Sequence, residues 1–327
     1  MSIVKTAVVT AGAMAVTAFL PACNGQAQFA PANIAGTAER SGRQATWMNS
    51  AAKSSDLIYV SNFDEPGVLV YTFPKGKLAG ELFGRGAVYG LCVDNAGDVF
   101  MPSDGLAEIF KYAHGGAHPI ATLKDRGQAP FGCAVDPTSG DLAVSNFESD
   151  SGGPGSISIY KNAKGKPTTY PDPGEFLYIY YIAYGGDGTL YLDGTTNSGG
   201  VGFATFKGGK FTTVTLNQSF QYPSAIGVGG SDVDVVDNGT PGTQAIDRFT
   251  ISGSTGSKVG STQLGGAYVV AGFDVVKRTV VVANDASGSQ NGDVEYFKYP
   301  AGGSATKSFT FSPYFYPQAV TVSEVTK

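Results

Sequence analysis

The chain has 327 residues and a formal net charge of −5, and charged residues make up only 15% of it. This acidic balance, without any run of Lys or Arg, excludes the basic stripe of a nucleic-acid-binding protein, and a hydrophobic content of 42% excludes a disordered chain. Gly (46), Pro (17) and aromatic residues (12%) are typical of short strands joined by tight turns, so we expect one all-β folded unit.

The first 22 residues have the pattern of a signal peptide. Lys5 precedes a run of apolar or small residues at 6–20, which is shorter than the ~20 residues of a membrane span. The run ends in LPAC (20–23), which resembles the bacterial lipobox. The resemblance implies export and a lipid on Cys23 that anchors the chain to a membrane of the cell envelope. The alternative is an ordinary signal peptide cut near Ala27, which would release a secreted protein.

The next segment is typical of a linker. Residues 24–55 are rich in Ala, Gln, Asn and Ser and show no hydrophobic periodicity, as flexible linkers do. We therefore expect residues 23–55 to form a flexible tether and residues 56–327 to form the folded domain.

From residue 57 onward one phrase recurs, an aliphatic strand that ends in a small residue and Asn or Asp. The copies are LIYVSN (57–62), DVFMPSD (98–104), DLAVSN (141–146), TLYLDG (189–194), DVDVVDN (232–238) and TVVVAND (279–285). Their spacing of about 41–48 residues is the length of four strands with their turns, which is one blade of a β-propeller. We therefore predict six blades.

Each phrase is followed by three further segments with strand patterns. A segment with an aromatic residue comes next, for example 67–73, and a segment that alternates Thr or Ser with apolar residues, such as 211–217, suits the outer blade edge. An apolar run with Gly or Ala, such as 131–136, suits the innermost strand. These segments give each predicted blade its four strands.

The two ends of the repeat complement each other. The last unit stops after an inner strand at 318–323, and the first unit begins at residue 57 without one. Pairing of 57–62 with 318–323 would close the ring and remove an exposed sheet edge. The predicted fold is an all-β, six-bladed β-propeller whose N- and C-terminal strands share one blade.

Two stretches carry a family resemblance. YGLCVDNAGDVFMPSD (89–104) and FGCAVDPTSGDLAVSN (131–146) resemble the NHL/YncE-like class of bacterial propeller proteins. The resemblance covers about residues 56–327 and implies the fold and an exported protein, which we expect to be monomeric. It assigns no activity, because propellers include hydrolases, lyases, sensors and adhesion modules.

A propeller brings the ends of the repeated phrases and the starts of the inner strands to one face near its axis. The phrase ends supply amides and carboxylates, and the inner strands supply aromatic rings, which together could hold a cation such as Ca²⁺ or a sugar stacked on tyrosine. The alternative is that Asn and Asp cap the turns after their strands while the rings fill space between blades. The candidate ligand-binding residues are Asn62, Asp104, Asn146, Asp193, Asp237, Asn284, Tyr89, Phe131, Tyr180 and Tyr222.

We expect a non-enzymatic binding module that recognises a protein or carbohydrate partner through this axial face. The alternative is a divalent-metal-dependent hydrolase of the gluconolactonase/regucalcin-like type, whose E-G-P motif would place a Glu in the phrase VYGLCVD (88–94), where none occurs. A streptogramin-lyase-like activity would need a histidine near the axis, and we expect His114 and His118 to lie in a peripheral turn.

Carboxylates in two loops of the same face could serve as acid and base for glycoside cleavage. These residues are Asp64, Glu65, Glu148 and Asp150. Their loops are rich in Gly and Pro, where acidic residues commonly serve solubility alone.

The sequence also bears on the two cysteines beyond Cys23. Cys92 and Cys133 lie on neighbouring predicted inner strands, but the aligned phrases match Cys92 with Ala134. Because successive side chains on a strand alternate faces, the two thiols should point in opposite senses. We therefore predict buried free thiols rather than a disulfide, even in an oxidising compartment.

Overall fold

The computed structural model describes residues 45–62, 67–285, 292–311 and 315–325. The predicted signal peptide, Cys23 and the first part of the predicted tether lie outside these residues, as do Asp64 and Glu65. In the described part, no helix is long and apolar enough to cross a membrane. The helical segments are single 3-10 turns, η1 (Ser50–Ser54), η2 (Asp104–Leu106) and η3 (Lys161–Ala163).

One five-stranded sheet contains both ends of the described chain. In sheet order its strands are β1 (Trp47–Met48), β4 (Leu78–Phe83), β3 (Gly67–Thr72), β2 (Leu57–Asn62) and β26 (Pro317–Ser323). β2 pairs antiparallel with β26 from Leu57 opposite Ser323 to Asn62 opposite Pro317. This pairing confirms that the N- and C-terminal strands share one sheet. Strand β1 and helix η1 lie in the segment that we assigned to the tether, so the folded part begins before residue 56.

Three further sheets have four antiparallel strands each. The first contains β5 (Cys92–Val93), β6 (Val99–Ser103), β7 (Glu108–Tyr112) and β8 (Pro119–Lys124). The second contains β9 (Gln128–Val135), β10 (Leu142–Ser149), β11 (Ser156–Tyr160) and β12 (Thr168–Pro171). The third contains β21 (Val270–Val276), β22 (Thr279–Asn284), β23 (Asp293–Lys298) and β25 (Lys307–Thr310).

The remaining strands form one nine-stranded sheet. Four consecutive strands form its first run: β13 (Phe176–Tyr184), β14 (Leu190–Thr196), β15 (Val201–Lys207) and β16 (Lys210–Leu216). The next four form its second run: β17 (Ile226–Gly229), β18 (Asp232–Asp237), β19 (Ala245–Ser252) and β20 (Thr255–Gly265). Strand β24 (Gly303–Ser304) pairs with β20. A short parallel pairing of β16 with β20 joins the two runs at their outer strands. The structure therefore has four separate sheets and one merged sheet in a propeller-like arrangement, where six separate blades were predicted.

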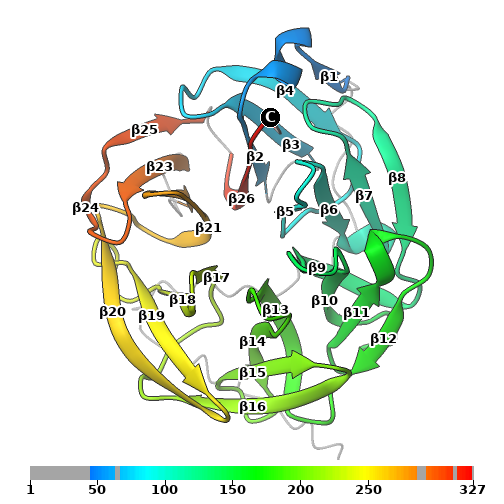
Figure 1. Cartoon of the computed structure of the whole chain (residues 1–327), viewed down its shortest axis with the longest axis vertical. Coiled ribbons are helices and arrows are strands. Elements are labelled where there is room, and N and C mark those ends of the chain that lie inside the picture. The colour runs from blue at the N-terminus through cyan, green and yellow to red at the C-terminus, as the bar shows by residue number, and fades with distance from the viewer. Residues whose placement is uncertain (1–44, 63–66, 286–291, 312–314, 326–327) are drawn as a thin grey trace, which may run out of the picture. The chain divides into compact units, whose positions relative to one another are not determined.

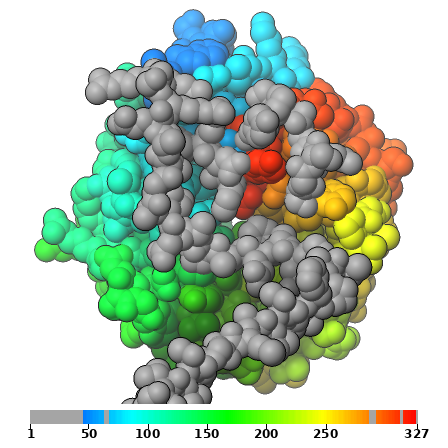
Figure 2. All heavy atoms as spheres, turned by 180° about the vertical axis from the view of Figure 1, so that it is seen from behind, coloured from blue at the N-terminus to red at the C-terminus, as the bar shows by residue number. Residues whose placement is uncertain are grey.

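Figure 1 shows the sheets around one centre, with β26, β5, β9, β13, β17 and β21 nearest to it. From the opposite side, the colours run round the ring in chain order and the red end of the chain lies close to the blue beginning (Figure 2). All described strands belong to one compact unit, Ser41–Lys327.

Side-chain alternation along β2 explains how the sheets pack. Tyr59 packs with Met101 of the next sheet, and Val60 packs with Val281 of the preceding sheet. Every residue of β2 is therefore buried, because each face of the strand meets a neighbouring sheet. Burial of one such side chain contributes about 1.5–3 kcal/mol. The outer strand β16 instead alternates exposed threonines with apolar residues, since one of its faces meets water.

A disulfide joins Cys92 of β5 to Cys133 of β9, with their Cα atoms 5.7 Å apart. The prediction of two free thiols is therefore wrong. It assumed that side chains on opposite faces of equivalent strands point apart, but in a ring the front of one sheet meets the back of the next. An offset of one residue between the strands is what turns the two sulfur atoms toward each other. Phe100 and Val144 bury them between the two sheets.

His114 lies where the ring closes. Its Nδ1 is 2.6 Å from the Ser323 hydroxyl of β26, and its Nε2 is 3.0 Å from the Ser55 carbonyl. The Ser323 hydroxyl also donates to the Gly97 carbonyl at 2.6 Å. His114 lies in the turn between β7 and β8, as predicted, and it links both ends of the described chain to the second sheet, whereas His118 is exposed.

Candidate functional site

Two of the predicted axial residues accept hydrogen bonds from the backbone of inner segments. Asn62, at the end of β2, is 2% exposed, and its Oδ1 accepts from the N–H of Tyr316 at 2.8 Å. Asp193, at the end of β14, is fully buried and accepts from the N–H groups of Tyr181 (3.1 Å) and Ser224 (2.7 Å). Burial raises the pKa of Asp193 well above its usual range. Asp193 therefore links the two runs of the merged sheet.

Two further predicted residues are buried in similar contacts. Asn284 accepts from the Tyr268 N–H at 2.8 Å and donates to Asp293 Oδ1 at 2.8 Å. Asn146 donates to the hydroxyls of Ser156 (2.9 Å) and Ser158 (3.1 Å). Bonds of this kind agree with the alternative interpretation, in which the Asn and Asp residues hold turns and strands together.

The last two polar candidates are partly exposed. Asp237 accepts from the Gln218 side chain at 3.0 Å. Asp104 begins η2, and its pKa is raised first by burial and then by the carboxylates of Glu148 and Asp150. The charges of Glu148 and Asp150 thus act on the carboxyl group of Asp104.

Aromatic rings gather beside these carboxyl groups. Tyr89 stacks on Phe131 with ring centroids 5.0 Å apart, and Phe147 stacks on Tyr178 at 4.1 Å. Tyr180 makes edge contacts with Phe131 (5.2 Å) and Phe147 (5.1 Å). Each such pair adds about 0.5–1.5 kcal/mol beyond its buried area. We call the six rings in contact the aromatic cluster: Tyr89, Phe131, Phe147, Tyr178, Tyr180 and Tyr181.

The cluster contains three of the four predicted aromatic residues. Tyr222 makes none of its ring contacts, and its carbonyl accepts instead from the Ser224 hydroxyl at 3.2 Å. Sequence reasoning missed Phe147, Tyr178 and Tyr181. Phe147 directly follows the SN of the repeated phrase, and Tyr178 and Tyr180 are two residues apart on one strand, so both had a sequence signal.

Tyr181 had no such signal, because a β-bulge brings it to the cluster. The pairing of β13 with β14 shifts register between Ile179 and Ile182, and a bulge re-aims the side chains within it. Both Tyr180 and the adjacent Tyr181 consequently contact Phe131, with ring centroids 5.2 Å and 5.5 Å from the Phe131 centroid.

The carboxyl groups act electrostatically on the rings. The pKa of Tyr89 is raised by burial and then by Asp104. Burial raises the pKa of Tyr180 to about 12, and Glu148 is among the smaller causes. The carboxylates therefore lie close to the aromatic cluster, although Asp150 itself is exposed.

A cavity of about 60 Å³ lies on the axis. It has room for a few water molecules but is far smaller than the usual small-molecule pocket of about 300–1,000 Å³. Tyr89 and Tyr181 belong both to its lining and to the aromatic cluster. The axial cavity and the aromatic cluster are therefore adjacent. The lining comes from segments 89–91, 132–133, 181–182, 225–226, 271–273 and 318–320.

Glycine allows the inner segments to approach one another round this cavity. A Cβ atom on Gly90 would lie 2.6 Å from the Phe131 carbonyl oxygen, and one on Gly272 would lie 2.9 Å from the Gln318 carbonyl oxygen. The Gly or Ala in each predicted inner strand thus serves close packing about the axis.

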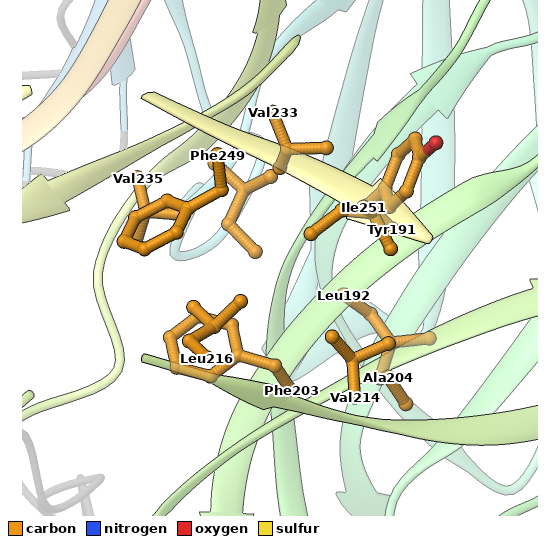
Figure 3. A pocket seen from close by; sticks show the side chains of 11 residues that line it. Tyr191, Leu192, Phe203, Ala204, Val214, Leu216, Val233, Val235, Phe249 and Ile251 are labelled. Carbon is orange, nitrogen blue, oxygen red and sulfur yellow. The ribbon is translucent and has the colours of Figure 1, made fainter. Parts of the chain in front are cut away.

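A second cavity, of about 10 Å³, lies between the two runs of the merged sheet (Figure 3). Its walls are apolar and include Leu192, Phe203, Leu216, Val235 and Phe249. An apolar void of this size stays dry. It is a packing gap in the core, and Tyr191 is the one residue of its lining with a polar side-chain group.

Within the described ranges, no group of three or more His, Cys, Asp or Glu residues is placed to hold a metal ion. The suggested Ca²⁺ site thus gains no cluster of acidic ligands from the described residues.

Comparison with known proteins identifies similar folds only. No known family and no curated protein matches the sequence. A chain from the crystal structure of a nidogen/laminin complex is 13% identical with a TM-score of 0.65, and the match covers 83% of this chain and 99% of that one. A protein of unknown function from Bacteroides caccae is 11% identical with a TM-score of 0.61, with 82% and 98% covered. At such identities the similarity concerns the fold alone, and together with the sheet arrangement it shows a β-propeller.

Proposed function

We propose that this chain is an exported binding module that holds a ligand or partner on its axial face, at the aromatic cluster. The observation that carries the proposal is the aromatic cluster, whose rings Tyr89, Phe131 and Tyr178 are partly exposed, at the edge of an axial cavity too small to hold the ligand itself. Aromatic residues, tyrosine among them, are enriched at recognition surfaces. The similar chain from the nidogen/laminin structure belongs to a complex of proteins, which supports a protein partner here.

We also propose that the ring has six blades of the NHL/YncE-like type, with the two runs of the merged sheet as separate blades. Each run is a four-stranded antiparallel unit, and only a two-residue parallel pairing joins them. Six separate inner segments line the axial cavity, which supports the same count.

Export with a lipid on Cys23 is the third part of the proposal, and we expect the anchored protein to be a monomer. The Cys92–Cys133 disulfide supports export, because disulfides persist mainly in oxidising compartments. In cells that grow with labelled palmitate, the wild-type protein should incorporate the label and the Cys23→Ser variant should not. Equal labelling of both proteins would contradict Cys23 as the site of the lipid, and no labelling of the wild type would contradict the anchor and leave a secreted protein. We do not propose the metal-dependent hydrolase, because no observation on the described residues favours it.

The binding proposal is tested by titration calorimetry with defined probes. The probes are cellohexaose, chitohexaose, mannohexaose and hexapeptides of lysine, arginine or glutamate. We expect at least one probe to bind the wild-type chain and to bind Tyr178→Ala much more weakly, because Tyr178 is a partly exposed ring of the cluster. Tyr268→Ala is the matched control, since Tyr268 is a partly exposed tyrosine outside the cluster. Binding that Tyr178→Ala leaves unchanged, or no binding at all, would refute the proposal.

A further inference from the structure

Three hydrogen-bond contacts meet around His114, where the ring closes. His114 Nε2 is 3.0 Å from the Ser55 carbonyl oxygen, and His114 Nδ1 is 2.6 Å from Ser323 Oγ. Ser323 Oγ is in turn 2.6 Å from the Gly97 carbonyl oxygen. A carbonyl oxygen only accepts, so Nε2 must carry a proton and the Ser323 hydroxyl must donate to Gly97. Because this uses the single hydrogen of the hydroxyl, Nδ1 must carry a proton as well.

The three contacts therefore need three protons. The Ser323 hydroxyl supplies one, and a neutral imidazole supplies one more, whereas an imidazolium ion supplies two. With a neutral His114, one of the contacts would bring two lone pairs together. Ser323 is 0% exposed and Gly97 is buried, so water cannot replace the missing donor between them. The geometry thus fits the doubly protonated histidine.

These contacts lie at one end of the strand pair that closes the ring. Ser323 is the last residue of β26 and pairs with Leu57, the first residue of β2. Ser55 lies just before β2, and Gly97 lies in the turn between β5 and β6 of the second sheet. Local unfolding starts most readily at the ends of a chain. His114 therefore ties both ends of the described chain to the second sheet at the point where we expect the ring to open first.

Charged groups of both signs surround His114. Each residue that it contacts through these bonds is followed by an acidic one, and η1 places Lys53 beside Gly115, the next residue after His114. Among the described residues, Asp98 pairs with Lys111, as does Asp94, and Glu324 pairs with Lys277. Asp56 accepts from the Val325 N–H at 2.8 Å. The hydroxyl of buried Tyr59 accepts from the Gly115 N–H, and burial raises its pKa to about 12, so it stays neutral. Because most of these charges are paired, the three contacts decide how many protons His114 holds.

We infer that His114 is a pH-sensitive latch, whose imidazolium form holds β2 and β26 to the second sheet and whose deprotonation loosens the closure of the ring. Histidine is the side chain whose charge changes between about pH 5 and 8. In an unfolded chain it releases its proton near pH ~6.5. The stability from the second proton is therefore fully present below that pH, and it is lost as the pH rises through the range in which the folded protein releases it. The latch acts independently of the proposed binding function.

The first test is NMR of the full wild-type chain with ¹⁵N-labelled histidine, because the sequence contains only two histidines. Ring nitrogen shifts report protonation, and His118→Gln assigns the signals. As the pH rises, both nitrogens of His114 should stay protonated to a higher pH than those of His118, which is exposed. A His114 that loses its second proton at the same pH as His118, or at a lower one, would overturn the inference.

The second test is urea unfolding at pH 5.5 and 8.5. The folding equilibrium constant of the wild type should fall about tenfold more over this range than that of His114→Gln or Ser323→Ala. Ser323→Ala keeps the histidine but removes the hydroxyl that requires the second proton. Buried carboxyl groups titrate alike in all of these proteins and cancel in the comparison, and the matched control His118→Gln should behave as the wild type does. The same pH dependence in the wild type and in both latch variants would contradict the latch, and the NMR measurement decides the matter if a variant does not fold.

Discussion

Asp125 should make the protein less stable at neutral than at mildly acidic pH. This residue follows β8, is 1% exposed, and its Oδ1 accepts from the Ser158 hydroxyl at 2.8 Å. Burial raises its pKa from 3.8 to about 6, against smaller lowering effects of Ser158, Asn146 and Tyr160. The folded state therefore holds the proton up to higher pH than the unfolded chain. Stability from this proton is fully present below pH ~4 and is lost as the pH rises through about 6.

The size of the effect follows from the two pKa values. A difference of about 2.2 units corresponds to about 3 kcal/mol in full. Between pH 4.5 and 7.5 the two titration curves give a loss of about 2 kcal/mol. Urea unfolding of the wild type at these pH values should show at least this loss, since burial also raises the pKa of Asp234 to about 6 and that of Glu295 to about 7.

The variant Asp125→Asn isolates the contribution of one carboxyl group. Between pH 4.5 and 7.5, the free energy of unfolding should decrease by about 2 kcal/mol less for this variant than for the wild type. Asp187→Asn should leave the pH dependence between pH 4.5 and 7.5 nearly unchanged, because the Lys207 hydrogen bond leads the causes that lower the pKa of Asp187 to about 2, and the stability from its charge is lost only as the pH falls below about 4. Identical pH dependence of the wild type and Asp125→Asn would refute the reasoning.

Three further predictions concern the ring itself. Replacing Cys92 and Cys133 together by Ser should cost about 4 kcal/mol in urea unfolding under oxidising conditions, from the entropy of a 41-residue loop, and reductant should abolish the difference from wild type. His114→Ala should cost about 1–3 kcal/mol, because it leaves the buried Ser323 hydroxyl without one partner, whereas His118→Ala, at an exposed site, should change the unfolding midpoint little. Gly90→Ala should lower the thermal unfolding temperature, since its Cβ would lie 2.6 Å from the Phe131 carbonyl oxygen; an unchanged temperature would show that the inner strands can move apart.

The closure of the ring was predictable, but the merging of two sheets was not. The repeated phrase occurs six times at similar spacing. Its first copy, β2, has no inner strand before it, and it pairs with the last inner strand of the chain, β26. The merging depends on two residue pairs, Thr215 with Thr255 and Leu216 with Gly256. Gly256 allows this approach, because a Cβ there would lie 2.4 Å from the Leu216 side chain. A contact that rests on one glycine at the end of a long outer strand leaves no periodic signal.

The repeat pattern of the sequence could identify some of the candidate residues but not others. The Asn and Asp residues at the phrase ends recur because each blade needs the same hydrogen bonds, as Asn62 and Asn284 illustrate. Residues that repeat in every blade therefore serve the scaffold. A ligand surface that lies to one side of the axis must instead come from residues that differ between blades. The inner-strand register shift itself recurs in the pairs β9–β10, β2–β26 and β21–β22, but only β13 carries two adjacent tyrosines there, Tyr180 and Tyr181. Glu148 has a counterpart, Asp64, after one other copy of the phrase. Substituting the repeated residues should therefore change stability first, whereas substituting Tyr178 of the same strand β13 should change binding first.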